Sequence, residues 1–296
     1  GSGWYPGELV KLVIHEEPPL DPDLTLYSTC DDTGAFLNDV FWTDIHDVGV
    51  TFTLTATGMQ SGLTAQTVFT DSQANLDQWA NLPKWQEFLN GNLGQANSLY
   101  YEGVSIPYRI TFGGLEPGPH TVVIEWDTTK GGHHAIDYLT SYIQPNPGFP
   151  QIPPNPCLGV SSCNPADFTT FPIPADPQVT GALVAPVPGV FTFYGATITS
   201  VSAYSYPDGN GFEGDKSAQI SITFNATTEY PVLAWGGHIA RRQDWGPNGS
   251  AVAISGSPYH TRLIALDGTG GNQDRSLSAD AVIFPGKITI IKQATP

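Results

Sequence analysis

The segment from Asp208 to Asp215, with the sequence DGNGFEGD, has the residue types of a metal site. Carboxylate and amide oxygens are the ligands that Ca²⁺ prefers, and glycines let a backbone wrap around an ion. The candidate ligands are Asp208, Asn210, Glu213 and Asp215. Their spacing differs from the twelve-residue helical Ca²⁺ loop, in which acids alternate and a glutamate comes last. Calcium is therefore the candidate cofactor, and an ordinary acidic turn is the alternative.

Catalytic chemistry has weaker support. An acidic region could supply the carboxylate pair of a glycosidase, but no two residues stand out by spacing among Asp21, Asp23, Asp31, Asp32, Asp39, Asp44 and Asp47. A zinc site needs three or four ligands that converge, and the scattered imidazoles are His133, His134, His238 and His260. No nucleophile elbow, phosphate-binding loop or His-Glu-x-x-His motif is present. We therefore expect no catalytic residues and no enzyme activity.

Two features point to glycans. Trp245 lies between Asp244 and Gly246 in a loop-like segment, and tryptophan rings stack on sugar faces in binding modules. A place in the core or in an interface is the alternative for this ring. Asn225 and Asn248 each begin a triplet of the N-glycosylation pattern, so we expect both side chains to be exposed.

The composition favours an extracellular protein made of short strands. The chain has 296 residues, 40% of them hydrophobic and 13% charged, with 32 glycines and 26 prolines. So many prolines leave little room for long helices. The net charge of −17 would repel nucleic acid. No apolar run reaches the length of about eighteen residues that a membrane span needs. Scarce lysine with abundant Thr, Ser, Gly and Pro favours secretion or display on the cell surface.

The cysteines fit the same environment. Cys157 and Cys163 flank five residues within a proline-rich stretch, and a loop of that size can close as a disulfide. Cys30 then remains as a buried apolar residue or as a free thiol.

Strand patterns occur on both sides of that proline-rich stretch. Val48–Thr57 alternates apolar residues with threonines, as a half-buried strand does, and seven short candidates begin at Val190. One stretch has helical spacing, through Trp79, Leu82, Trp85 and Phe88. We predict an all-β protein of two β-sandwich halves, jelly-roll or Ig-like, with one or two short helices inserted in the first. The expected divisions are 1–144 with the helical insertion near 71–91, a connector at 145–178, a second sandwich at 179–285 and a terminal strand at 286–296.

The terminal segment is a strong strand candidate. Residues 286–296 read GKITIIKQATP, with β-branched residues in the middle, and the candidate assembly strand consists of Lys287, Ile288, Thr289, Ile290, Ile291 and Lys292. No hairpin turn follows to return the chain, so this strand must pair inside its own sheet or with another chain. Leu9–Glu16 is a similar candidate near the N-terminus.

The segment GKITIIKQATP resembles the opening strand of the prealbumin-like repeats of bacterial surface proteins. Residues 270–276, GGNQDRS, with Ala281-Val282-Ile283 after them, resemble the region that precedes those repeats. The resemblance implies a non-catalytic cell-surface or extracellular structural protein with a β-sandwich N-terminal region, and it implies no catalytic residues.

We therefore expect an extracellular structural protein, such as a filament or adhesin subunit whose copies join by strand exchange. An added strand gains main-chain hydrogen bonds, and head-to-tail donation builds filaments because it does not close. Its partners would be copies of itself or other surface proteins. Two alternatives remain open, namely a carbohydrate-binding or Ca²⁺-dependent adhesion module with glycans as partners, and a secreted glycosidase.

Overall fold

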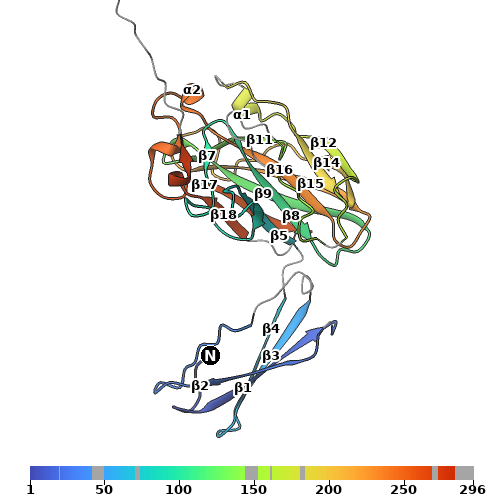
Figure 1. Ribbon diagram of the computed structural model, residues 1–296, viewed down its shortest axis with the longest axis vertical. Helices are drawn as coiled ribbons and strands as arrows, with labels where there is room; N and C mark the ends of the chain where they lie inside the picture. Colours follow the sequence, from blue (N-terminus) through green and yellow to red (C-terminus); the bar gives the residue numbers. More distant parts are fainter. Residues whose placement is uncertain are drawn as a thin grey trace, which may run out of the picture. The chain divides into compact units, whose positions relative to one another are not determined.

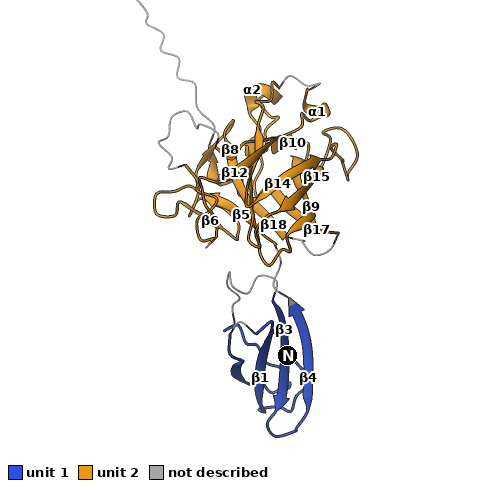
Figure 2. Cartoon of the chain, turned by 90° about the vertical axis from the view of Figure 1, so that its right-hand side faces the viewer, with its two compact units in different colours: residues 1–73 blue, residues 74–296 orange. Residues whose placement is uncertain are grey.

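The computed structural model describes residues 1–19, 21–41, 50–70, 74–143, 153–160, 162–180, 184–268 and 273–283. The predicted all-β class is confirmed (Figure 1). The chain divides into two compact units, residues 1–73 (unit 1) and 74–296 (unit 2), which Figure 2 colours separately. The predicted strand at 286–296 lies outside the described residues.

Unit 1 is a single antiparallel sheet with the strand order β2-β1-β3-β4. Its strands are β1 (Leu9–Glu17), β2 (Leu24–Thr29), β3 (Thr51–Gly58) and β4 (Thr64–Thr70). Alternate residues such as Val10, Leu12 and Phe52 are buried on one face, as the period of two in their sequence requires. The candidate assembly segment Leu9–Glu16 falls in β1, which is already paired on one side with β2 and on the other with β3.

Unit 2 is a β-sandwich. The first sheet has the order β14-β15-β9-β17-β18, with β10 paired to β9. Its strands are β14 (Ala196–Val201), β15 (Lys216–Ala226), β9 (Gly118–Lys130), β17 (Tyr259–Leu266), β18 (Gln273–Leu277) and β10 (His133–His134).

The second sheet has the order β12-β13-β16-β8-β5-β6, with β11 paired to β16. Its strands are β12 (Phe168–Pro172), β13 (Val190–Tyr194), β16 (Val232–Ile239), β8 (Ser105–Phe112), β5 (Ala74–Ala80), β6 (Glu87–Leu89) and β11 (Ile136–Thr140). A short parallel pair joins β7 (Tyr100–Tyr101) to β19 (Val282–Ile283). The helices are α1 (Pro177–Thr180) and α2 (Arg242–Trp245), with 3-10 turns at Ala251–Ala253 and Ala279–Ala281.

The main core of unit 2 joins strands from both sides of the proline-rich segment. Trp126 on β9, Tyr108 on β8 and Trp235 on β16 are fully buried in it. Strand β9 lies between β15 and β17, and β8 lies between β5 and β16. Because each sheet needs strands from both halves of the sequence, the compact units divide at residue 73 and not at the expected connector 145–178.

The helices expected near 71–91 are wrong, because the described part of that stretch is a β-hairpin. Trp79 on β5 pairs with Phe88 on β6, with ring centroids 5.1 Å apart. Strand β5 also pairs with β8, so the hairpin belongs to a sheet. Trp79 stands on β5, Phe88 stands on β6, and Leu82 and Trp85 lie in the turn between them. Their spacing of three residues therefore does not reflect a helix. Pairing with β8 therefore overrides the local period.

The predicted disulfide between Cys157 and Cys163 is confirmed, with Cα atoms 5.1 Å apart. Its loop packs against Tyr194 and Val232 of the second sheet of unit 2. Cys30 is buried and is not part of a disulfide. None of the helices in the described ranges has the length and apolar character needed to cross a lipid bilayer.

Candidate functional site

The apolar face of unit 1 is covered unevenly. Two irregular stretches, residues 1–7 and 30–41, lie over β1 and bury Val10 and Leu12 beneath Trp4 and Phe36. On β4 the same face stays open, because Ala65 and Thr67 are exposed. Unit 1 therefore has one complete sheet and only part of a second layer.

The open part forms a groove of about 330 Å³, which we call the unit 1 groove. Its walls and floor include Trp4, Phe36, Leu54, Ala56, Ala65 and Thr67. Small side chains on β3 and β4 leave space beside the two aromatic rings of the covering stretches. The groove is thus mainly apolar, and it runs next to the outer edge of β4.

Backbone hydrogen bonds hold the covering stretches to each other. The Trp4 N–H donates to the Gly34 carbonyl at 3.1 Å, and the Phe36 N–H donates to the Gly1 carbonyl at 2.8 Å. Gly34 has a φ of +74°, and a Cβ there would lie 2.0 Å from the Trp4 carbonyl oxygen. Glycine is therefore required for this close approach.

Glu8 fixes the turn that follows β3. Its buried carboxylate accepts hydrogen bonds from the N–H groups of Tyr5, Gln60 and Ser61. Burial acts to raise the pKa of this carboxyl, but the hydrogen bonds from Ser61 and the other donors outweigh it and lower the pKa to about 2. A carboxylate that accepts several backbone N–H groups is held in its charged form.

The two edges of the unit 1 sheet differ. Past β2 the chain turns directly into the covering stretch, and Asn38 Nδ2 donates to Ser28 Oγ at 2.9 Å. Among the described residues, no strand pairs with the outer edge of β4. That strand, TAQTVFT, has no charged residue and no proline, the usual means of protecting an exposed edge. Phe69, on the same face as Ala65 and Thr67, and Val68, on the opposite face, are exposed apolar residues of this strand.

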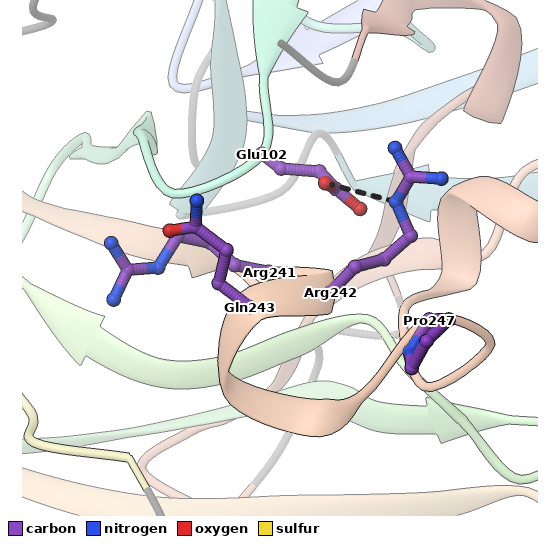
Figure 3. Close-up of a pocket in the computed structure, with 5 residues that line it drawn as sticks. All are labelled: Glu102, Arg241, Arg242, Gln243 and Pro247. Atoms are coloured by element: carbon purple, nitrogen blue, oxygen red, sulfur yellow. Dashed lines mark hydrogen bonds and ion pairs between the residues drawn. The ribbon is translucent and has the colours of Figure 1, made fainter. Parts of the chain in front are cut away.

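Unit 2 has a second hollow beside α2, with a volume of about 290 Å³ (Figure 3). Arg242 Nε lies 3.4 Å from Glu102 Oε2, whereas Arg241 points away and forms a two-pronged ion pair with Asp244 at 2.6 and 2.9 Å. Gln243 and Pro247 complete the lining. Both arginines of this hollow are therefore paired with acidic residues.

Trp245 belongs to a packed aromatic cluster. One side of its ring stacks on His134 at a centroid distance of 3.5 Å, and Phe212 approaches at 5.2 Å. Trp245 Nε1 donates to Asp137 Oδ2 at 2.9 Å, and the other carboxylate oxygen of Asp137 lies 2.6 Å from His238 Nδ1. The Trp245 ring, which was predicted to bind sugar, is thus half-buried and packed on one side. This placement resembles that of a core or interface residue, which was the alternative prediction.

In the loop predicted to bind calcium, Asp208 and Asp215 contact other side chains of the protein. Asp215 pairs with Lys130 Nζ at 2.6 Å, and Asp208 accepts a hydrogen bond from Ser217 at 2.7 Å. Asn210 and Glu213 lie in the same turn, on either side of Phe212. Within the described ranges, no group of three or more His, Cys, Asp or Glu side chains is placed to hold a metal ion.

The remaining predicted residues are scattered. Asn225 and Asn248 are exposed, as their triplets require, on β15 and in the loop after α2. His133 Nδ1 contacts the Asn248 carbonyl, and His260 pairs with Asp274. Asp44 and Asp47 lie outside the described residues.

The unit 1 groove was not predicted from the sequence. The sequence feature that could have indicated it is Thr64–Thr70, an uncharged segment rich in β-branched residues that follows the turn at Gly62. The residues that leave the groove open are the small ones, Ala56 and Ala65, whose effect depends on what packs above them. No protein-family model matches the chain, and a comparison with curated proteins also found no match.

Proposed function

We propose that this protein is an extracellular, non-catalytic structural subunit of a cell-surface filament or adhesin, whose copies join by strand exchange. One observation carries the proposal, which is that the unit 1 groove lies beside the outer edge of β4, with which no described strand pairs. An incoming strand would find main-chain donors and acceptors on β4 and unfilled apolar surface in the groove.

The main-chain groups of β4 and the apolar surface of the groove both favour assembly. Strand addition supplies affinity through the backbone ladder and specificity through alternate side chains. Each branched apolar side chain that is fully buried adds about 1.5–3 kcal/mol. Donation from one copy to the next has no symmetry that closes it, so the product is a filament.

Other features are consistent with an extracellular location. The Cys157–Cys163 disulfide persists in oxidising surroundings, and both glycosylation triplets have exposed asparagines. The carbohydrate-binding or Ca²⁺-dependent adhesion module and the secreted glycosidase stay as untested predictions, and no contact described above favours either one over assembly.

The test is direct. The purified chain is studied by light scattering over a hundredfold range of concentration and by negative-stain electron microscopy. We expect concentration-dependent polymers of uniform width. A chain that stays monomeric at every concentration and forms no polymer would contradict the proposal.

A further inference from the structure

Resting on the proposed function, we infer that the unit 1 groove of one copy accepts residues Lys287–Lys292 of a second copy, as a new strand along the outer edge of β4. In this arrangement Ile288 and Ile290 enter the groove, while Thr289 and Ile291 face away from it, because successive side chains of a strand point to opposite faces.

The groove matches such a strand in its spacing. Ala65 and Thr67 stand two residues apart on the groove face of β4, as Ile288 and Ile290 do on the incoming strand. Opposite residues on neighbouring strands lie about 5 Å apart, so two branched side chains would lie beside two small ones. Trp4 and Phe36 line the other side of the groove.

Other edges of the described sheets are less suited to strand addition. Strand β12 ends in Pro172, β6 has three residues, and β18 contains Asp274 and Arg275. Strand β14 is uncharged, but a bulge interrupts it after Ile198, whose side chain is already buried. Only β4 combines an uncharged seven-residue edge with an unfilled apolar groove among the described strands.

Charge also favours this pairing. Residues 1–73 contain one lysine, no arginine and 11 acidic residues, so unit 1 has a net charge of −10 out of the total of −17. The incoming segment has Lys287 and Lys292 and no acid. Opposite charges on the two partners accelerate their encounter and disfavour wrong partners.

The positions at which the chain enters and leaves unit 2 favour binding of Lys287–Lys292 to a second copy. The alternative is self-insertion, in which this segment binds the groove of its own copy. The chain enters unit 2 at Ala74, which pairs with Phe112 at one end of β8. It reaches Ile283 at the other end, where Ile283 accepts a hydrogen bond from the N–H of Glu102, close to Ser105 and α2. The eight residues of β8 span about 24 Å.

Short connections limit self-insertion. From Ile283 to Lys287 the extended chain covers at most about 14 Å. The stretch from Ala74 back to Thr70 has the same number of residues and the same limit. Self-insertion would need both connections to stretch toward each other along β8. Donation to another copy has no such requirement.

Two variants of the 296-residue chain, each with its own control, test the inference by complementation. Ala65→Trp fills the groove from an exposed position, and Thr64→Trp, on the opposite face of β4, is its control. Ile290→Asp breaks the donor, and Ile291→Asp, on the other face, is its control. We expect Ala65→Trp and Ile290→Asp to raise the concentration needed for assembly at least about tenfold, with both controls close to the unchanged chain.

Mixing the two defective variants gives the decisive result. The donor of Ala65→Trp is intact and so is the groove of Ile290→Asp, so a mixture should form two-copy complexes and no polymers. Circular dichroism and thermal melting verify that each variant is folded, and Thr67→Trp provides a second groove variant.

The failures are distinguishable. Polymers from Ala65→Trp and Thr67→Trp, with none from Ile290→Asp, would place the acceptor elsewhere and overturn the inference while leaving strand exchange intact. Polymers from Ile290→Asp would exclude this segment as the donor. A monomeric unchanged chain would overturn the inference together with the proposed function.

Discussion

The carboxylate of Asp137 lies 2.6 Å from Nδ1 of His238, and both side chains are buried between β11 and β16. The second oxygen of Asp137 accepts the indole N–H of Trp245 at 2.9 Å. One carboxylate therefore connects two strands of a sheet to helix α2. This makes Asp137 the main polar support of that end of unit 2.

Removing this support should destabilise unit 2 in a graded way. Asp137→Ala leaves the buried imidazole of His238 and the half-buried indole N–H of Trp245 without this partner, which costs about 2–5 kcal/mol of unfolding free energy. Asp137→Asn costs less, because its amide can accept from Trp245 and donate to the other tautomer of His238. Urea unfolding followed by tryptophan fluorescence measures both.

Asp215→Ala is the matched control, since it breaks the exposed pair with Lys130 and should cost at most about 1 kcal/mol. Equal losses for Asp137→Ala and Asp215→Ala would show that the buried network contributes nothing special.

Acid should weaken unit 2 before unit 1. Burial lowers the pKa of His134 to about 4, against the opposing influence of Asp137. The unfolded imidazole titrates near 6.5, so the unfolded state binds more protons between pH 6.5 and 4. Stability is therefore full above pH 6.5 and falls as the pH drops through this window, by on the order of 2 kcal/mol.

His134→Phe keeps a ring against Trp245 and should remove this part of the slope in melting temperature against pH. In unit 1, Glu8 has a pKa of about 2 and an unfolded value near 4.5, so its contribution is lost only below pH 4.5. Simultaneous loss of both units above pH 5 would contradict this order.

Local patterns predicted the class of the fold but not its partition. The alternation in Val48–Thr57 predicted β3 because one face of that strand is buried, and the loop size predicted the disulfide. The hairpin of Trp79 and Phe88 was missed because its pairing with β8 is long-range. The unit boundary was missed for the same reason, since β9 takes neighbours from residues 216–226 and 259–266. The groove depends on small residues whose role appears only when the second layer is known.

The ion pair between Arg109 and Asp77 should be costly to break. Arg109 Nε lies 2.8 Å from Asp77, with both side chains under a tenth exposed, and Arg109 Nη1 donates to the carbonyls of Pro156 and Leu158 beside the disulfide. Arg109→Met leaves a buried carboxylate unpaired, so we expect a loss of about 3–5 kcal/mol. The double variant Arg109→Met, Asp77→Leu should recover part of it in urea unfolding. Additive losses in this cycle would contradict direct coupling.

Reversing the donor's charge should make the salt dependence of assembly steeper. Two copies of net charge −17 repel each other, so added salt should speed assembly by screening that repulsion, while the local attraction of Lys287 and Lys292 to a unit of net charge −10 partly offsets it. In the variant Lys287→Glu, Lys292→Glu the local attraction becomes repulsion, so assembly should be slower at low salt and should accelerate more steeply as salt is added. Light scattering at 20 to 500 mM NaCl measures the rates. Lys84→Glu, which changes an exposed lysine beside Trp85 in unit 2, is the control and should keep the salt dependence of the unchanged chain. The same salt dependence in the double lysine variant and the unchanged chain would mean that the segment does not approach unit 1, because a donor that meets the acidic unit makes the dependence steeper.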